Sequence, residues 1–239
     1  MIGTAGWSIA ARDKALFDHE GSHLERYARR FDAVEINSSF YRPHKPATYA
    51  RWAASVPRGF RFSVKLPKAI THEARLIEAG AAIERFAAET AGLGSNLGVV
   101  LVQLPPSLAF DVGVACAFFA ACRQHISAPL VLEPRHASWF EPAADDVLIA
   151  ERIARVAADP ARVVAAALPG GWPGLAYFRL HGSPVIYRSS YADRLPEIAR
   201  ALRAAGDSAW CIFDNTASMA AISDAVGLSA LLHDEAASA

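Results

Sequence analysis

Short, unbroken runs of apolar residues alternate along this chain with longer segments that carry apolar residues at helical spacing. Unbroken apolar runs are typical of parallel strands that are covered on both faces. They predict eight strands, at Met1–Trp7, Ala33–Phe40, Phe60–Leu66, Leu97–Leu104, Pro129–Arg135, Ile153–Asp159, Leu175–His181 and Ala209–Asn215.

Helical patterns fill most of the gaps between these strands. Alanine-rich segments with helical periodicity cover residues 23–31, 46–56, 78–93, 112–126, 193–206 and 218–232. Strand followed by helix, eight times at roughly 30 residues per unit, predicts an α/β protein with one (β/α)8 TIM-barrel-like domain spanning residues 1–239. We expect the sixth helical unit to be short or irregular, because the stretch between Asp159 and Leu175 is brief and contains PGGWPG, and the fifth unit is also short.

A doubly wound open sheet is the alternative architecture. Such a sheet usually carries a glycine-rich nucleotide loop after its first strand. The first strand here leads through GTAGWS, which matches neither GxGxxG nor GxxxxGK[ST]. The sequence therefore favours the barrel.

Composition and charge narrow the class of protein. The 239 residues are 53% hydrophobic, and 24 basic residues balance 24 acidic ones, so we expect no strong attraction to nucleic acid or to an anionic membrane. Three cysteines without CxxC spacing argue against a disulfide framework or a structural zinc site. With no membrane-length apolar run and no signal-peptide pattern at the start, we expect a cytoplasmic protein.

Polar side chains recur at the carboxyl ends of the predicted strands. Because residues two apart point the same way along a strand, pairs at this spacing share a face. These strand-end residues are Glu35 and Asn37, Ser63 and Lys65, Gln103, Glu133 and Arg135, Asp159, Arg179 and His181, and Asp214 with Asn215. In a barrel they converge on the mouth where barrel enzymes carry their sites. An ion-pair network that only caps the barrel is the competing interpretation, because the charges nearly balance.

Several stretches of the chain resemble the YecE-like family, domain-of-unknown-function family seventy-two. They are GTAGWS, VEINSSFYRPHKPATYARWAASVPRGFRFSVKLPKAITH, LVQLPPS, LEPRHASWF, YFRLHG and FDNTASMAA, in this order. The resemblance implies a TIM-barrel-like fold but no established reaction. Its recurrent polar positions are Glu35, Asn37, Lys65, Thr71, His72, Gln103, Glu133, Arg135, Arg179, His181, Gly182 and Asn215. Asp214 departs from the family pattern, which leaves its role open.

The main functional hypothesis is an enzyme that acts on an anionic small molecule or a phosphoester at this mouth. Glu35 or Glu133 would be the general base and His181 the general acid. Expected substrate contacts are Asn37, Tyr41, Lys65, His72, Gln103, Arg135, Trp139, Arg179, Tyr187, Tyr191 and Asn215. Arginines suit this role because they bind phosphate and carboxylate bidentately, and loop aromatics suit a small organic ligand.

Three alternatives stay open, and the sequence identifies neither a cofactor nor an oligomeric state. Glu35, Glu133, Asp159 and His181 could bind a divalent metal, although the nearby cations oppose one and no HxH or HExxH spacing is present. Two of the carboxylates could hydrolyse a glycoside. A barrel pocket could also bind a ligand without turnover.

Overall fold

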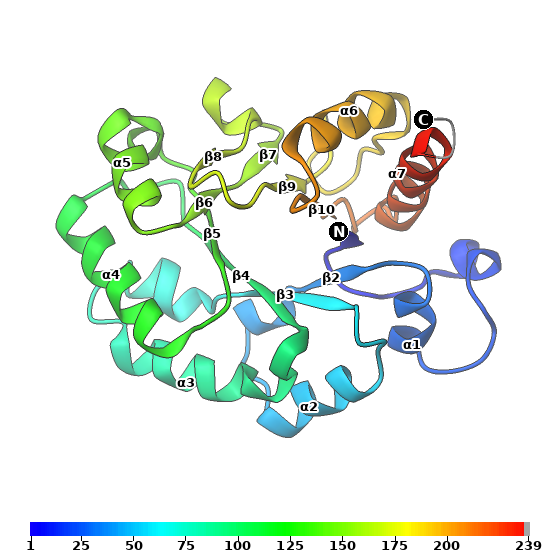
Figure 1. Cartoon of the computed structure of the whole chain (residues 1–239), viewed down its shortest axis with the longest axis horizontal. Helices are drawn as coiled ribbons and strands as arrows, with labels where there is room; N and C mark the ends of the chain where they lie inside the picture. Colours follow the sequence, from blue (N-terminus) through cyan, green and yellow to red (C-terminus); the bar gives the residue numbers. More distant parts are fainter. Residues whose placement is uncertain (237–239) are drawn as a thin grey trace.

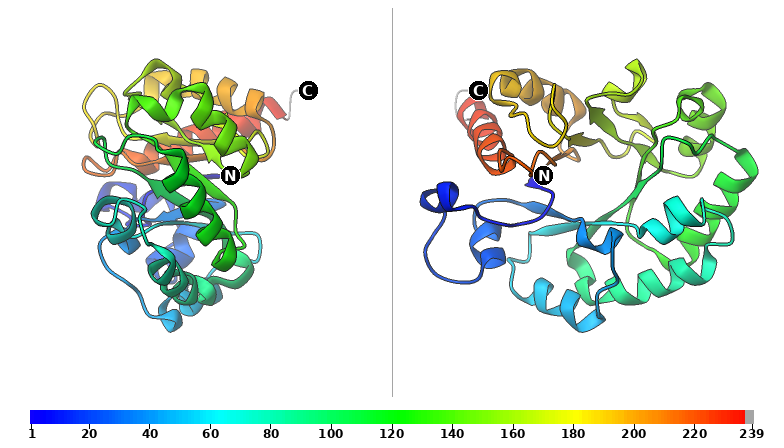
Figure 2. Two further views of the ribbon diagram at one scale, coloured as in Figure 1. Left: turned by 90° about the vertical axis from the view of Figure 1, so that its left-hand side faces the viewer. Right: turned by 180° about the vertical axis from the view of Figure 1, so that it is seen from behind.

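The computed structural model describes residues 1–236 and shows an α/β fold, with strands at the centre and helices around them (Figures 1 and 2). The strands are β1 (Ile2–Thr4), β2 (Ala33–Ile36), β3 (Arg61–Lys65), β4 (Leu97–Gln103), β5 (Leu130–Glu133), β6 (Ala154–Arg155), β7 (Ala157–Asp159), β8 (Gly170–Gly171), β9 (Tyr177–Leu180) and β10 (Trp210–Phe213). Each of the eight predicted strand ranges contains at least one of them. The predicted α/β class is therefore confirmed.

The strands form two sheets, with the orders β2-β3-β4-β5-β6-β8 and β1-β10-β9-β7. All pairs are parallel except β6 with β8, a two-residue strand that the sequence did not predict. A single bridge between Ala5 and Glu35 links the β1 and β2 sides. On the other side, Val156 separates β6 from β7. The strand order follows successive βα units, but the pairing is that of two sheets, so a closed (β/α)8 barrel stays a prediction.

Seven α-helices lie within or overlap the predicted helical segments and the short fifth unit. They are α1 (His23–Ala28), α2 (Pro46–Ala54), α3 (Gly80–Thr90), α4 (Val112–His125), α5 (Pro142–Ala150), α6 (Leu195–Ala205) and α7 (Ala221–Ala236). Helix α1 begins at a capping box, in which Ser22 and Glu25 satisfy each other's backbone N–H groups. The fifth helix has 9 residues. In place of a sixth helix the chain forms the 3₁₀ turn η6 (Val164–Ala167), because proline and glycine interrupt this stretch.

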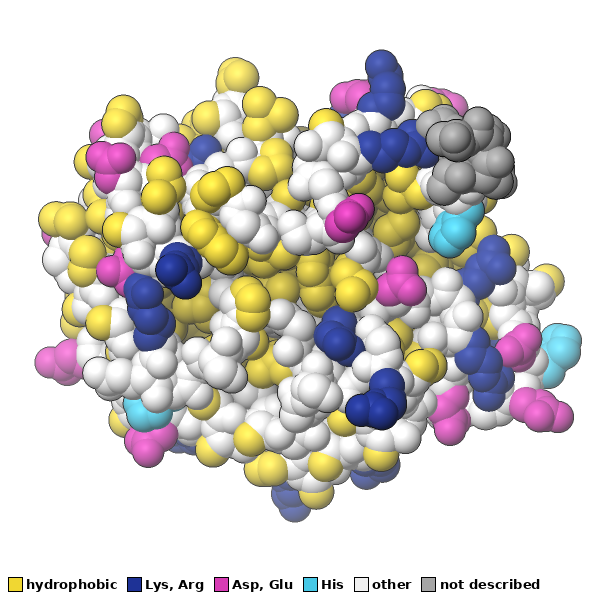
Figure 3. All heavy atoms as spheres, in the orientation of Figure 1, with side chains coloured by type: hydrophobic (Ala, Val, Ile, Leu, Met, Phe, Trp, Pro, Cys, Tyr) yellow, Lys and Arg dark blue, Asp and Glu magenta, His cyan; other side chains and the backbone are white. Residues whose placement is uncertain are grey.

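Further single turns connect these elements and carry several of the residues discussed below. They are η1 (Ala11–Leu16), η2 (Ser38–Phe40), η3 (Ala69–Glu73), η4 (Ala91–Asn96), η5 (Ala137–Phe140) and η7 (Ala192–Arg194). Within the described residues, no helix is both long and apolar enough to cross a membrane. In the orientation of Figure 1, hydrophobic side chains gather in the middle of the visible face, with Lys and Arg side chains around them (Figure 3).

The core has two layers that follow from the alternation of side chains along each strand. The smaller cluster contains Ala33, Val99, Leu101, Val131, Ala154, Val156, Leu175, Tyr177, Trp210 and Ile212. The larger cluster contains the intervening strand residues, such as Val100 and Val102, together with buried helix residues. Moving two residues on from Ala33, Leu101 or Val131 leads to Glu35, Gln103 or Glu133. The polar residues at the strand ends therefore continue the face that forms the smaller cluster.

Candidate functional site

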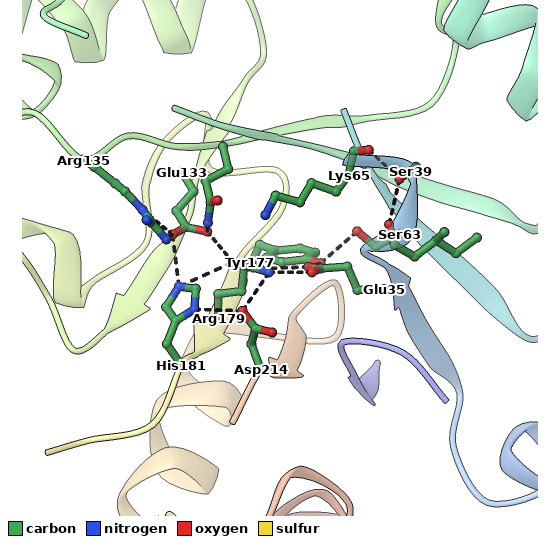
Figure 4. Close-up of polar contacts among 12 residues, drawn as sticks. Glu35, Ser39, Ser63, Lys65, Glu133, Arg135, Tyr177, Arg179, His181 and Asp214 are labelled. Atoms are coloured by element: carbon green, nitrogen blue, oxygen red, sulfur yellow. Dashed lines mark hydrogen bonds and ion pairs between the residues drawn. The ribbon is translucent and has the colours of Figure 1, made fainter. Parts of the chain in front are cut away.

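Arg179, on β9, is the centre of a buried cluster of charges (Figure 4). Its side chain is 0% exposed, and it contacts a carboxylate from each of three other strands or strand ends. Nε and Nη2 donate to Glu35 at 2.9 and 2.6 Å, and Nη1 donates to Glu133 at 2.9 Å. Nη2 also lies 3.1 Å from Oδ2 of Asp214. Burial lowers the pKa of Arg179, but Glu35 and Asp214 outweigh it and hold that pKa well above its ordinary value.

His181 follows β9 and lies between two of the same carboxylates. Its Nε2 is 3.0 Å from Glu133 Oε1, and its Nδ1 is 3.0 Å from Asp214 Oδ2. Burial, the largest influence, lowers the pKa of His181, and so does the charge of Arg179, but the Glu133 charge and the hydrogen bonds to Asp214 and Glu133 together raise it overall. The protonated imidazole donates to both acids, so this site favours an imidazolium. Asp214, whose role the sequence left open, therefore orients His181 and neutralises Arg179.

Glu133, at the end of β5, accepts hydrogen bonds on both oxygens. Oε1 accepts from His181 and from Arg135, whose Nη2 is 3.2 Å away. Oε2 accepts from Arg179 and from Gln103, whose Nε2 is 3.0 Å away. Burial raises the pKa of Glu133, but His181 and Arg179 outweigh burial and hold it well below its ordinary value. While all these donors stay in place, Glu133 is a weak base.

Glu35 lies on β2 and belongs to the floor of the cluster rather than to its open side. It is 0% exposed, and Arg179 and the Tyr177 hydroxyl occupy its oxygens. The Tyr177 hydroxyl also lies 2.8 Å from Ser63 Oγ. These contacts indicate that Glu35 holds Arg179 in place, and its part as a base stays a prediction. The sequence analysis did not select Tyr177, although its position two residues before Arg179 places it on the same strand face.

Lys65 ends β3, and its amine points toward the cluster around Glu133 and Arg179 (Figure 4). The residue is 5% exposed, and Nζ lies 4.1 Å from the centre of the Phe40 ring. No hydrogen bond or ion pair of this amine is found within residues 1–236. Burial, followed by the charge of Arg179, lowers the pKa of Lys65 to about 8.

A pocket of about 410 Å³ opens beside Glu133 and His181. Its wall also includes Arg135, Arg162 and Tyr187. Tyr187 lies over His181 with ring centroids 6.0 Å apart. Arg162, which the sequence analysis did not select, is exposed and has no hydrogen bond or ion pair in the described part of the chain. It follows the two Ala residues and Asp159 of β7 in an irregular loop, where only the structure could show that it reaches the pocket.

Several predicted ligand contacts have hydrogen-bond partners within the protein. Trp139 in η5 is 1% exposed, and its Nε1 donates to the Leu108 carbonyl at 3.0 Å. The Tyr191 hydroxyl donates to Asp159, and Asn215 Nδ2 donates to Asp224. The Arg179 guanidinium is paired with three carboxylates. Because these polar groups are buried, their donors bond within the protein, whereas the buried Oδ1 of Asn215 has no partner within the described residues.

The remaining predicted contacts lie around the cluster. Tyr41 is 71% exposed and packs on Phe40 beside a separate pocket of about 340 Å³. His72 in η3 bonds to Thr71 and packs edge-on against Phe40. Burial and the charge of Lys65 lower the pKa of His72. Asn37 follows β2, and its buried Oδ1 has no partner within the described residues.

The predicted metal ligands do not converge in the described part of the chain. Asp159 accepts from Tyr191 and pairs with Arg194, whereas Glu35 and Glu133 pair with Arg179. Among the side chains that the structure describes, no group of three or more His, Cys, Asp or Glu residues has the spacing that holds a metal ion. The same pairing leaves no two carboxylates free to flank a glycosidic bond.

Comparison with known proteins gives a family match over the whole chain. The model of the family described as "Protein of unknown function DUF72" matches residues 1–239. UPF0759 protein YecE of Escherichia coli (strain K12) is 35% identical over 82 residues, covering 34% of this chain and 30% of that protein. UPF0759 protein YunF of Bacillus subtilis (strain 168) is 28% identical over 158 residues, covering 59% and 52%. The matches span about half of these relatives' length or less.

Two similar solved structures agree with the fold. A DUF72 family protein from Enterococcus faecalis superposes with a TM-score of 0.81 at 20% identity, covering 97% of this chain and 94% of that one. A DUF72 family protein from Thermotoga maritima gives a TM-score of 0.77 at 22% identity, covering 97% and 98%. At this level of identity the likeness establishes the fold and no reaction.

Proposed function

The chain belongs to the family described as "Protein of unknown function DUF72", and we propose that it is an enzyme acting on a small molecule that carries a phosphate or carboxylate group. One observation carries this proposal. The acids of the cluster already have partners inside the protein, whereas basic groups line the adjacent pocket. Such a pocket attracts an anion and repels a cation.

Arg135 and Arg162 are the proposed anion-binding groups. Arg162 is unpaired within the described residues, and Arg135 has only Glu133 as an ion-pair partner there. Guanidinium groups bind phosphate and carboxylate through two parallel hydrogen bonds. His181, held as an imidazolium, adds a third positive charge on the same wall. We therefore keep Arg135 as a substrate contact and replace Arg179 with Arg162.

The proposed chemistry starts when the substrate anion draws Arg135 away from Glu133. Arg135 then no longer donates to Glu133 Oε1, to which its Nε and Nη2 lie at 3.4 and 3.2 Å. The loss of a donor and of a nearby positive charge raises the basicity of that carboxylate. Glu133 would then accept a proton, and His181 would supply one as general acid. This sequence links binding of the anion to activation of the base.

We also propose that the two sheets form one (β/α)8 barrel and that residues 1–239 are a single domain. The bridge between Ala5 and Glu35 and the proximity of β6 to β7 support the closure. Arg179 on β9 bonds Glu35 on β2 and Glu133 on β5, which draws the two sheets together. Three free cysteines support a reducing, cytoplasmic location.

A thermal-shift series tests the anion site. Inorganic phosphate, pyruvate, phosphoenolpyruvate and glucose would be compared at constant ionic strength, because exposed charges are screened by salt. An anion at ten times its Kd stabilises by about 1.4 kcal/mol, which raises Tm by roughly 3–6 °C. We expect a shift with at least one anion and none with glucose. The shift should be lost in Arg135→Gln and kept in Arg30→Gln, a change of an exposed arginine outside the pocket.

Equal shifts for glucose and the anions, or an unchanged shift in Arg135→Gln, would contradict the proposed site. Catalysis needs a second readout, and consumption of the bound anion by NMR supplies it. Glu133→Gln should still bind the anion but turn it over at least 100-fold more slowly. Unchanged turnover would remove Glu133 from the mechanism.

A further inference from the structure

Lys65 is a buried amine that the proposed acid–base chemistry does not use. A buried ammonium is normally paired with a carboxylate, because an unpaired charge away from water is costly. Three carboxylates lie in this cluster, but Arg179 and His181 occupy the oxygens that face the centre. Within residues 1–236, Lys65 makes no ion pair and instead lies over the Phe40 ring. The cluster therefore gives the Lys65 ammonium no ion-pair partner that would stabilise its charge.

The amine keeps a path to solvent. The amine nitrogen has no hydrogen-bond partner within the described residues, but it is not completely buried and retains some contact with solvent. The residue lies at the carboxyl end of β3, where its register partner on β4 is Leu101, two residues before Gln103, and Gln103 in turn pairs with Glu133 on β5. Ser39 Oγ donates to the Lys65 carbonyl at 2.6 Å and holds its backbone in place. The Lys65 backbone is therefore held in place, while its amine remains partly accessible to solvent.

We propose that Lys65 Nζ is a nucleophile that forms an imine with the carbonyl carbon of an aldehyde or ketone bearing an anionic group. The inference deepens the proposed function and rests on it, because the anionic group is the part of the substrate that Arg135 would hold. A neutral amine is the reactive form in such a step. Three features of the site support a neutral, reactive amine: burial, the neighbouring Arg179 charge, and the lack of a paired acid.

The protonation state fits this role. With a pKa of about 8, roughly a quarter of the Lys65 amines are neutral at pH 7.5, against about 0.1% for an ordinary lysine with a pKa of 10.5. Lysines made reactive in this way are desolvated or lie near another cation. Lys65 meets both conditions.

The step balances without a cofactor. The Nζ lone pair attacks the carbonyl carbon, and the carbonyl oxygen takes up a proton to give a carbinolamine. A second protonation lets that oxygen leave as water while the C=N bond forms. The nitrogen loses one proton when the carbinolamine forms and another after water has left. The net change is amine plus carbonyl to imine plus water, with no oxidation. His181, an imidazolium that lines the pocket together with Arg135, is the proposed donor to the departing oxygen.

Borohydride trapping tests the proposal on the wild-type chain. The protein is incubated with pyruvate at pH 7.5, sodium borohydride is added to reduce any imine to a stable secondary amine, and peptides are mapped by mass spectrometry. The chain has 4 lysines, Lys14, Lys45, Lys65 and Lys68, so labelling of each lysine can be compared. We expect labelling of Lys65 at least tenfold above the other three. Propanal, which lacks the anionic group, should label Lys65 at least tenfold less than pyruvate.

Matched variants sharpen the result. Lys65→Arg keeps the positive charge but cannot form an imine and should abolish the labelling. Lys68→Arg changes an exposed lysine that pairs with Glu73, and it should leave labelling of Lys65 unchanged. Equal labelling of all four lysines, or no label on Lys65 under conditions where pyruvate raises Tm, would overturn the imine while leaving the anion site standing. Labelling of Lys65 by propanal as strong as by pyruvate would support the amine and contradict the anionic group of the substrate.

Discussion

Arg179 links the residues that the sequence could only place at separate strand ends. Its guanidinium contacts Glu35, Glu133 and Asp214, and none of the four side chains has more than slight exposure. A buried pair of this kind adds little net stability, because desolvation offsets the attraction. Removing one partner is different, since it leaves the others charged, buried and unpaired.

Replacing Arg179 should therefore destabilise the protein strongly. We expect Arg179→Met to lower the free energy of unfolding at pH 7 by about 3–5 kcal/mol, measured by urea denaturation. Arg162→Met removes an exposed arginine without a partner in the described residues. It should change the free energy of unfolding by no more than about 0.5 kcal/mol. Similar losses in both variants would show that the cluster does not hold Arg179 as described.

His181 gives the network a pH dependence of known sign. Burial lowers its pKa in the folded state, but the Glu133 charge and the hydrogen bonds to Asp214 and Glu133 together raise that pKa above the ordinary value of 6.5. Its contribution to stability is fully present below pH 6.5 and is lost as the pH rises through the raised pKa. We expect His181→Gln to lower Tm more at pH 6 than at pH 9. His19→Gln changes an exposed histidine and is the control. An equal loss of Tm in His181→Gln at pH 6 and pH 9 would contradict an imidazolium at His181.

At the scale of elements, the segment between β9 and η7 closes over one side of the pocket. Tyr187, with a φ of 64°, brings its ring over His181, and its carbonyl accepts from Ala217 N. The Tyr191 hydroxyl accepts from Gly182 N at 2.8 Å and donates to Asp159. Asp224 on α7 accepts from Tyr191 N and Asn215. These contacts fix both ends of the segment.

Removing the Tyr191 hydroxyl should loosen this segment. Tyr191→Phe leaves Gly182 N without its acceptor, a buried loss of about 1–3 kcal/mol. Amide hydrogen exchange of residues 182–190 should accelerate by about tenfold or more, while exchange in β4 and β5 stays unchanged. Tyr41→Phe alters a tyrosine that is 71% exposed and should have no such effect. Unaltered exchange in Tyr191→Phe would mean that the segment is held elsewhere.

The sequence predicted this cluster because two-residue periodicity determines which side chains share a strand face. Each of five cluster residues lies two positions after a residue of the smaller core cluster. They are Glu35, Gln103, Glu133, Arg179 and Asp214. The sequence could not tell which of them pair with one another, since pairing depends on positions across the sheets. Trp139, Tyr191 and Asn215 look like ligand contacts by type and location, but their hydrogen-bond partners Leu108, Asp159 and Asp224 lie on other elements or loops, which strand periodicity does not relate to them.

At the scale of the molecule, the strand and helix order was predictable because each βα unit is local in sequence. The short sixth unit was predictable from its proline and glycine residues, whereas strand β8 was not, because Gly170 and Gly171 carry no strand pattern. Arg162 shows the same limit for function. It reaches the pocket from an irregular loop, and no periodicity relates it to the strand ends.

The central claim is that an anion binds against Arg135 and draws it away from Glu133. A crystal structure with the anion that raises Tm most tests it directly. We predict that the phosphate or carboxylate oxygens lie about 2.7–2.9 Å from the Arg135 guanidinium, and that Arg135 no longer contacts Glu133 Oε1. An anion bound outside this pocket, or an Arg135 still paired with Glu133 when the anion is present, would contradict the claim.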